Sequence, residues 1–153
     1  MKYTATLLAV TDMERSKRFY EQALGLRVTA DFGANVTLGG ILTLQTAESW
    51  QGFIRGRDIA FRNNAGELYF ETDDLDGFLD RLRPFDVEFV HPPLTHSWGQ
   101  RAVRFYDPDG HMIEVAEEIA MVVRRFAEQG LSPRQIARRM DVPASFVQEA
   151  LAD

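Results

Sequence analysis

The chain carries the same short pattern twice, and this repeat limits the folds open to it. Thr11-Asp12 ends a strand-like run and opens a helix-like segment, and Thr72-Asp73 does the same 61 residues later. In each copy, three further strand-like segments follow the helix. A β-α-β-β-β unit forms a curved sheet whose concave face it cannot cover. Two copies side by side therefore enclose a cleft, the usual location of small-molecule sites.

Composition narrows the classes of protein that fit this repeat. A chain of 153 residues has room for one domain with a full core and a short appendage. The absence of cysteine excludes thiol nucleophiles, disulfides and cysteine-based zinc sites. A formal net charge of −6 argues against a nucleic-acid surface, and no apolar run is long enough to cross a membrane. The N-terminus lacks the residue order of a signal peptide, so we expect a cytoplasmic protein.

Periodicity divides each copy into elements. Thr11 and Glu14 have the spacing of a capping box, and an apolar stripe follows them as far as Gly25. In the second copy, Leu75 begins an amphipathic helix that ends at Pro84. The predicted strands are 3–10, 27–31, 35–38 and 41–45 in the first copy, and 67–71, 87–90, 101–106 and 112–116 in the second.

The remaining segments connect or extend the copies. We interpret residues 47–64 as an irregular linker, whereas residues 118–153 change to a helix-only pattern with a second capping box at Ser132 and Gln135. The sequence therefore predicts an α+β fold. Residues 1–117 form two β-α-β-β-β modules, 1–46 and 65–117, in a curved mixed sheet around a cleft, and an all-helical tail follows.

Two stretches resemble a known superfamily. TDMERSKRFYEQALGLRV is similar to the first helix, and WGQRAVRFYDPDGHMIEVAE to the closing hairpin, of the vicinal oxygen chelate superfamily. That group includes glyoxalase I, bleomycin-resistance proteins and extradiol dioxygenases, and paired β-α-β-β-β modules are its fold. The resemblance covers roughly residues 1–117. Such motifs specify a fold far more than a reaction.

The resemblance also implies where a metal would lie. Family enzymes typically hold a divalent metal with side chains from the first and last strand of each copy. The second copy carries Glu67 and Glu114 at these positions, but the first carries Ala5 or Thr6, depending on register, and Thr43. Neither Ala nor Thr is an ordinary ligand of transition metals. We therefore expect no full metal site and no cofactor; a divalent metal, if present, would bind Glu67 and Glu114.

Strand alternation places several side chains without help from the resemblance. In the run 67–71, Leu68 and Phe70 share the face suited to packing on helices, so the odd positions point to the cleft. The same argument applies to the last strand of each copy. The side chains predicted to face the cleft are Glu67, Tyr69, Glu71, Glu114, Thr43 and Gln45.

Several roles are open to these groups. Glu67 and Glu114 are either ligands of a weak metal site, a carboxylate pair for proton transfer, or partners of Arg101 or Arg104. His96 is either an acid, base or ligand at the cleft mouth or an exposed loop residue, and we expect His91 to be exposed. The candidate catalytic residues are Glu67, Glu114 and His96, and the candidate ligand-binding residues are Tyr69, Trp98, Arg101, Thr43, Gln45, Phe32 and Trp50.

The tail looks like a small helix-turn-helix, but its charge does not suit DNA. Its would-be recognition helix, residues 144–152, carries Glu149 and no Lys or Arg, and residues 117–153 hold five arginines against six acidic residues. A helix that enters a groove needs positive charge where it meets phosphate. We therefore interpret the tail as a packing or dimerisation element.

One leading hypothesis and two alternatives follow. The leading hypothesis is a glyoxalase- or bleomycin-resistance-like protein that binds a small organic ligand in the cleft without the usual metal. The resemblance implies a homodimer. The first alternative is a lyase, isomerase or dioxygenase that uses Glu67 and Glu114 with a divalent ion or as acid and base. The second is a ligand-responsive regulator whose tail binds DNA.

Overall fold

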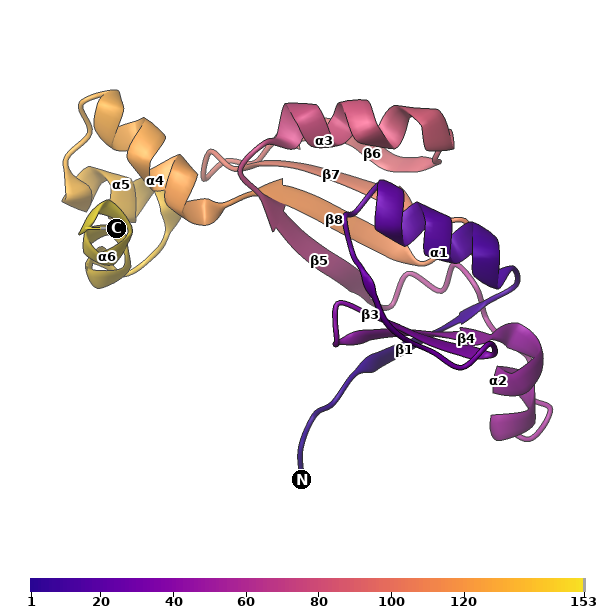
Figure 1. Cartoon of the computed structure of the whole chain (residues 1–153). Helices are drawn as coiled ribbons and strands as arrows, with labels where there is room; N and C mark the ends of the chain where they lie inside the picture. The colour runs from indigo at the N-terminus through magenta and orange to yellow at the C-terminus, as the bar shows by residue number, and fades with distance from the viewer. Residues whose placement is uncertain (153) are drawn as a thin grey trace.

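The computed structural model describes residues 1–152 and contains two four-stranded sheets (Figure 1). The first has the order β1-β4-β3-β2 and the second repeats it as β5-β8-β7-β6. The strands are β1 (Thr6–Val10), β2 (Val28–Asp31), β3 (Asn35–Leu38), β4 (Leu42–Thr46), β5 (Glu67–Thr72), β6 (Phe89–Thr95), β7 (Arg101–Tyr106) and β8 (Met112–Glu117). β1 runs parallel to β4, and β5 runs parallel to β8, whereas the other neighbouring strands are antiparallel. The predicted α+β fold of two modules is confirmed.

Equivalent helices follow β1 and β5. They are α1 (Met13–Gln22) and α3 (Leu75–Leu82), the latter extended by a 3-10 turn, η1 (Arg83–Phe85). Asp12 caps α1 by accepting a hydrogen bond from the backbone amide of Arg15, and Asp74 caps α3 in the same way. The predicted capping box of Thr11 and Glu14 is therefore wrong by one residue. Thr11 is instead bound to the other module: its amide and its hydroxyl both donate to Asp109.

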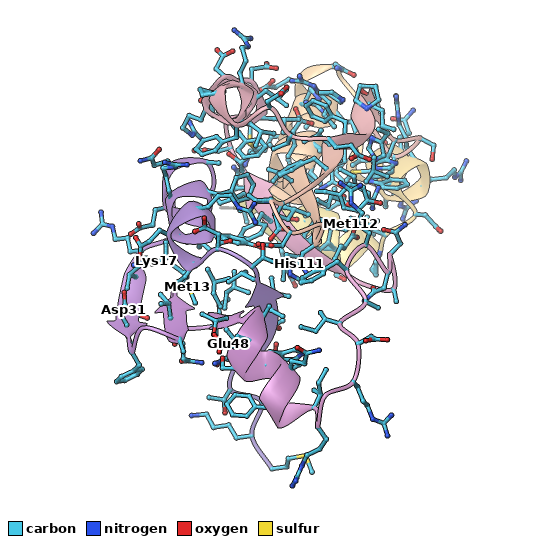
Figure 2. The ribbon with its side chains drawn as sticks, turned by 90° about the vertical axis from the view of Figure 1, so that its right-hand side faces the viewer. Met13, Lys17, Asp31, Glu48, His111 and Met112 are labelled. Atoms are coloured by element: carbon cyan, nitrogen blue, oxygen red, sulfur yellow. The ribbon has the colours of Figure 1, made fainter. Side chains whose placement is uncertain are left out.

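A single hydrophobic core joins the two modules. The Phe19 ring on α1 makes edge contacts with Phe85 and Phe105 of the second module, at centroid distances of 5.4 and 6.4 Å. Beside it, the buried Tyr20 hydroxyl donates to Asp107 at 2.7 Å. On the other side of α1, Lys17 and Asp31 lie 3.1 Å apart and face one another in Figure 2. Helix α1 therefore links its own sheet to the second module.

The turn that receives α1 is the predicted Asp107-Pro108-Asp109-Gly110 turn. It closes with a hydrogen bond from the Gly110 amide to the Asp107 carbonyl at 3.0 Å. Asp107 also accepts the backbone amides of Asp109 and His111 through its side chain. The Asp109 side chain contacts the first module: it accepts hydrogen bonds from the side chains of Arg15 and Ser16 of α1 in addition to those from Thr11. This turn is the main polar joint between the modules.

Two helical segments lie outside the paired modules. The connection that we interpreted as an irregular linker begins with a short helix, α2 (Ala47–Phe53). The tail folds into α4 (Ile119–Glu128), α5 (Pro133–Met140) and α6 (Ala144–Ala152), which share a separate core. The capping box of Ser132 and Gln135 is confirmed. In Figure 1 this three-helix unit projects from the end of β8. Within residues 1–152, no helix is both long and apolar enough to span a membrane.

Candidate functional site

Helices cover one face of each sheet, and within residues 1–152 the other face carries no helical layer of this kind. Leu42 and Leu44 of β4, and Ile113 and Val115 of β8, belong to the core under the helices. Leu68 and Phe70 of β5 pack against the same core. The alternation predicted from the sequence is therefore confirmed, and the intervening side chains lie on what we call the open face.

Four side chains form a row across the open face of the second sheet. The strand register aligns Tyr69 of β5 with Glu114 of β8, Glu114 with Arg104 of β7, and Arg104 with His91 of β6. Glu67 lies two residues before Tyr69 and so shares its face. The row and the adjacent Glu67 therefore bring together both predicted carboxylates and two basic side chains from neighbouring strands.

Arg104 is the centre of this row. Its Nε lies 2.9 Å from a carboxylate oxygen of Glu67, and its Nη2 forms an ion pair with Glu114. Its Nη1 lies 3.3 Å from Nε2 of His91. The expectation that His91 is merely exposed is wrong, because its half-buried ring touches this guanidinium. The Arg104 guanidinium thus pairs with two carboxylates and neutralises only part of their charge.

The row perturbs two acidic groups. Burial raises the pKa of Glu114; the charge of Arg104 opposes the rise, and the neighbouring Glu67 carboxylate adds to it. Burial and a hydrogen bond to Glu71 raise the pKa of Tyr69 to about 12, so that its phenol stays neutral. The Tyr69 hydroxyl donates to Glu71 at 2.8 Å and accepts from Gln100 at 3.2 Å.

The register also settles which residue of the first module corresponds to Glu67. Leu7 pairs with Thr43, as Tyr69 pairs with Glu114, so the equivalent of Glu67 is Ala5, two residues before Leu7. Neither Ala5 nor Thr43 offers a normal metal ligand. Among residues 1–152, no three His, Asp or Glu side chains are grouped closely enough to hold a metal ion. Because the Arg104 guanidinium pairs with both carboxylates, the donor set does not fit a transition metal.

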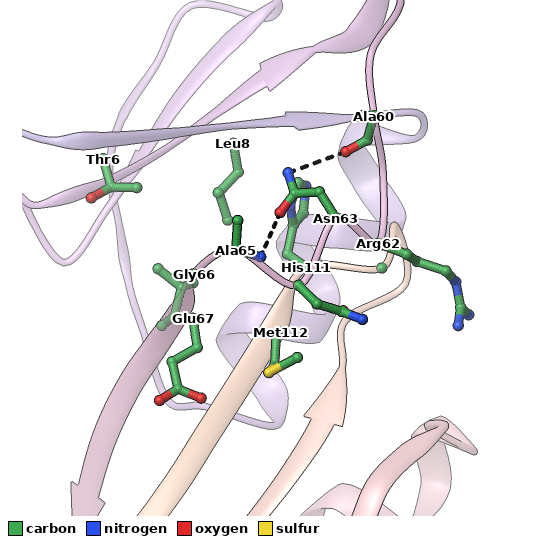
Figure 3. A pocket seen from close by; sticks show the side chains of 13 residues that line it. Thr6, Leu8, Ala60, Arg62, Asn63, Ala65, Gly66, Glu67, His111 and Met112 are labelled. Carbon is green, nitrogen blue, oxygen red and sulfur yellow. Dashed lines mark hydrogen bonds between the residues drawn. The ribbon is translucent and has the colours of Figure 1, made fainter.

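Two cavities meet at Glu67, in the gap between edge strands β1 and β5. One, of about 360 Å³, is closed by residues 60–66 of the connection and by His111 and Met112 (Figure 3). The other, of about 240 Å³, is more apolar and extends past Tyr69 to Tyr3 and Ile41. Both are lined by Thr6, Glu67 and Leu68. Figure 3 shows the Glu67 carboxylate at the end of the first cavity.

Most polar groups of the larger cavity are already bonded within the protein. Asn63 donates to the Ala60 carbonyl and accepts from the Ala65 amide, as the dashed lines in Figure 3 show. A ring nitrogen of His111 lies 2.8 Å from the carbonyl oxygen of Ala9. Arg62 forms an ion pair with Glu88 at 2.8 Å. Glu67 is the carboxylate that lines this cavity, and its partner Arg104 is shared with Glu114.

The predicted polar side chains of the first module lie on the open face but are buried. Thr43 is 6% exposed and Gln45 is 4% exposed. The Gln45 amide accepts from Asn35 and donates to Ser49 of α2, so this short helix covers the end of the sheet. Their burial makes direct ligand contact by Thr43 and Gln45 unfavourable, and Gln45 is in addition bonded to α2.

Three predicted ligand-binding residues are not brought together with the row. Arg101 lies on the opposite face of β7, where it pairs with Asp76 of α3 at 2.6 Å. Phe32 is 77% exposed in the turn after β2, at the far edge of the first sheet from β1. Trp50 is half-buried on α2. Arg101 lies three residues before Arg104, an odd separation along β7, so strand alternation assigns it to the helix side once Arg104 is placed opposite Glu114.

His96 and Trp98 lie in the segment between β6 and β7. Their rings stack at a centroid distance of 4.1 Å with planes 4° apart. Burial lowers the pKa of His96, and the positive charges of Arg104 and His91 lower it further. Trp98 donates to the Gln100 side chain at 3.0 Å and packs against the core of the three-helix unit. The sequence did not single out Gln100, which is 5% exposed and connects this segment to Tyr69.

The comparisons with known proteins agree with this architecture. Residues 3–120 match the family model described as a glyoxalase-like domain. A protein of unknown function from Agrobacterium tumefaciens is 37% identical, with a TM-score of 0.69 over 77% of this chain and 94% of that chain. A glyoxalase/bleomycin resistance protein/dioxygenase superfamily member from Sphaerobacter thermophilus is 27% identical, with a TM-score of 0.56 over 77% of this chain and 98% of that chain. No curated protein matches the chain.

A more distant structure shows the fold alone. A glyoxalase-related enzyme from Fulvimarina pelagi is 20% identical, with a TM-score of 0.67 over 78% of this chain and 89% of that chain. The family match ends at residue 120, so most of the three-helix unit lies beyond it.

Proposed function

Since the chain belongs to the glyoxalase-like domain family, we propose that it binds a small organic ligand in the two cavities beside Glu67, without a resident metal ion. The observation that carries the proposal is the position of Arg104. Its guanidinium neutralises part of the charge of Glu67 and Glu114, which is the task a bound cation would otherwise perform. Recognition then depends on direct contacts with side chains.

The cavities favour a particular kind of ligand. The smaller cavity is mainly apolar and is lined by Tyr69, whose side chain is about half exposed, and this suits an aromatic or aliphatic body. Glu67, Glu71 and Glu114 outnumber Arg104 on the open face, so the polar end of the ligand should be a cation or a hydrogen-bond donor. A compact amine with an apolar body meets both requirements.

The proposal is tested with a fragment library of aromatic and aliphatic amines, alcohols and carboxylates observed by ligand-detected NMR. Each hit is titrated against the wild type, Tyr69→Ala, Glu67→Gln and Phe53→Ala. Phe53 is a matched control because it is an aromatic residue, 66% exposed, on α2. We expect hits whose Kd rises at least about tenfold in the first two variants and less than about twofold in the third. Hits that bind all four proteins equally would refute the proposed location.

A second function is favoured by the environment of Glu114. Its raised pKa and its closeness to a second carboxylate suit an acid–base pair in a lyase or isomerase. Turnover of a bound ligand that falls at least about a hundredfold in Glu114→Gln, with binding retained, would support this function. Unchanged turnover in that variant would exclude the catalytic role of Glu114.

We also propose that the protein is a homodimer, as the resemblance to its family implies. The exposed apolar side chains Tyr3, Leu7 and Ile41 gather around β1, its N-terminal extension and the turn before β4. Light scattering with size-exclusion chromatography tests this, with about 35 kDa expected for the dimer, twice the 17.4 kDa of one chain. A mass near that of one chain would exclude it.

A further inference from the structure

The three-helix unit touches the sheets through a small set of contacts, and these lie next to the candidate site. The contacts involve the segment His96–Gln100, which joins β6 to β7, and Glu117 at the end of β8. One side of this segment faces the helices and the other faces Tyr69. The unit lies mostly beyond the family match, which ends at residue 120, so family membership alone does not account for it.

On the helical side, Arg125 of α4 forms the polar part of the contact. Its guanidinium donates to the Gly99 carbonyl at 2.6 Å and to both carboxylate oxygens of Glu117 at 2.9 Å. Glu117 is 6% exposed and also accepts the Arg101 amide. Such a two-pronged, half-buried pair fixes direction as well as distance.

The apolar part of the contact depends on Gly99. Its φ of +93° disfavours any side chain, and a Cβ atom there would lie 2.2 Å from the ring of Phe126 on α4. The neighbouring Trp98 packs against the same helical core. The segment therefore fits against α4 with backbone and ring in close contact.

On the other side, Gln100 carries the contact to the candidate site. Its amide donates to the Tyr69 hydroxyl at 3.2 Å and to the Glu117 carbonyl at 2.7 Å, and its oxygen accepts from Trp98 at 3.0 Å. Since Gln100 is buried and fully engaged, it cannot move without disturbing either Tyr69 or Trp98. The chain of contacts from Arg125 to Tyr69 is continuous.

We propose that Arg125 is a positioning residue: the three-helix unit uses it, with Phe126, to set the conformation of His96–Gln100 and so the orientation of Tyr69 at the smaller cavity. The coupling works in both directions, because a ligand that needs this orientation must also favour the docked position of the helices. The structural part stands without a ligand. The effect on affinity rests on the proposed function.

The first test needs no ligand. Amide hydrogen exchange is measured in the full-length wild type, Arg125→Gln, Arg125→Lys and Arg124→Gln. Arg124 is an exposed arginine on the same helix and serves as the matched control. We expect exchange over residues 96–101 and 69–71 to accelerate at least about tenfold in Arg125→Gln, with partial rescue by Lys and no change in Arg124→Gln. Unchanged exchange over both segments in Arg125→Gln would overturn the proposal.

Gly99→Ala disturbs the contact between the segment His96–Gln100 and α4 in a second way, with Arg125 unchanged. In a Trp50→Phe background, Trp98 is the remaining tryptophan, so its fluorescence reports the segment directly. A shift of its emission to longer wavelength, with the sheet still protected from exchange, is the expected result. An unchanged spectrum together with unchanged exchange at 69–71 would show that the helices do not set this segment.

The affinity part is tested with benzylammonium as probe. Arg125→Gln should weaken its binding at least about fivefold while Arg124→Gln leaves it unchanged. Equal binding by both variants, with accelerated exchange in Arg125→Gln, overturns the link to the cavity and leaves the proposed function standing. If benzylammonium does not bind the wild type, the same comparison is made with the tightest hit of the fragment library, and equal affinity in Arg125→Gln and Arg124→Gln then overturns the link to the cavity.

Discussion

Arg104 and Glu67 form an ion pair on the open face of the second sheet. The Nε of Arg104 is 2.9 Å from a carboxylate oxygen of Glu67, and the same guanidinium pairs with Glu114. The two modules repeat their backbone closely but differ in charge at equivalent positions. The second has Glu67 and Glu114 where the first has Ala5 and Thr43. Arg104 from β7, the strand beside β8, partly offsets this difference in charge.

Replacement of Arg104 by Met should destabilise the protein at neutral pH. It leaves Glu67 and Glu114 close together without a cation, at a cost of about 1–3 kcal/mol, reduced from the value for a fully buried pair because Glu67 is 30% exposed. In this variant the carboxylate pair has a raised pKa in the folded state. The loss of stability is therefore present at neutral pH and shrinks as the pH falls toward the glutamate pKa of the unfolded chain, about 4.3. Urea unfolding at pH 7 and pH 5 measures it; a loss equal at both values would contradict the argument.

Arg104→Ala should also create affinity for divalent transition metals. It frees Glu67, Glu114 and His91 from the guanidinium that each of them contacts, and once these side chains close into the vacated space they supply ligands that zinc and manganese accept. Isothermal titration with Zn²⁺ should give at least about tenfold tighter binding than in the wild type. The double variant Arg104→Ala/Glu114→Gln is the control and should lose that gain. If zinc binds the single variant no better than the wild type, Arg104 is not what keeps a metal from these carboxylates.

Tyr20→Phe should weaken the joint between the modules. The change leaves the buried Asp107 carboxylate without the hydroxyl that donates to it at 2.7 Å. An unsatisfied buried acceptor costs about 1–3 kcal/mol. Tyr3→Phe, at a position 76% exposed, is the matched control and should change the free energy of unfolding by less than about 0.5 kcal/mol. Chemical denaturation of both variants measures the two free energies of unfolding. Equal values would show that the hydrogen bond between Tyr20 and Asp107 does not stabilise the protein.

Acid should release the three-helix unit from the sheets before the core unfolds. Burial opposes the charge on Glu117, but hydrogen bonds from Arg125 and from the Arg101 amide outweigh it and leave its pKa below the ordinary value. A carboxylate whose pKa is lower in the folded state stabilises the folded state above about pH 4.3. This stabilisation is lost as the pH falls through the folded-state pKa. Trp98 fluorescence in the Trp50→Phe background, followed from pH 6 to pH 3, should show a transition that Arg125→Gln lacks. The same transition in both proteins would assign it to another group.

The sequence alone predicted the paired modules, because alternation and turn signals act locally. Leu68 and Phe70 were assigned to the helix side and the structure confirms them there. The errors come from contacts between distant segments. The spacing of Thr11 to Glu14 predicts a helix cap at Thr11, yet Asp109, 98 residues away, accepts hydrogen bonds from both the amide and the hydroxyl of Thr11.

The composition of the candidate site shows the same limit. Glu67 and Glu114 were predicted to share a face, and their common partner was left open between Arg101 and Arg104. Only the register of β7 against β8 decides between them, because it places Arg104 opposite Glu114. Gln100 has no local signal at all: its role follows from the way α4 packs on the segment before β7.

The charge of the open face predicts which ligands bind. Benzylammonium, benzyl alcohol and benzoate share one apolar body and differ in charge, so they separate electrostatics from burial. With Glu71 and Glu67 near Tyr69 and one arginine already engaged, benzylammonium should bind at least about fivefold more tightly than the alcohol, and benzoate more weakly than either. The preference should shrink in 0.5 M salt and in Glu71→Gln, and persist in Glu21→Gln, which changes an exposed carboxylate on α1. Equal affinity for the cation and the alcohol would mean that these carboxylates do not select the ligand, whereas the cavity itself would still account for binding of the apolar body.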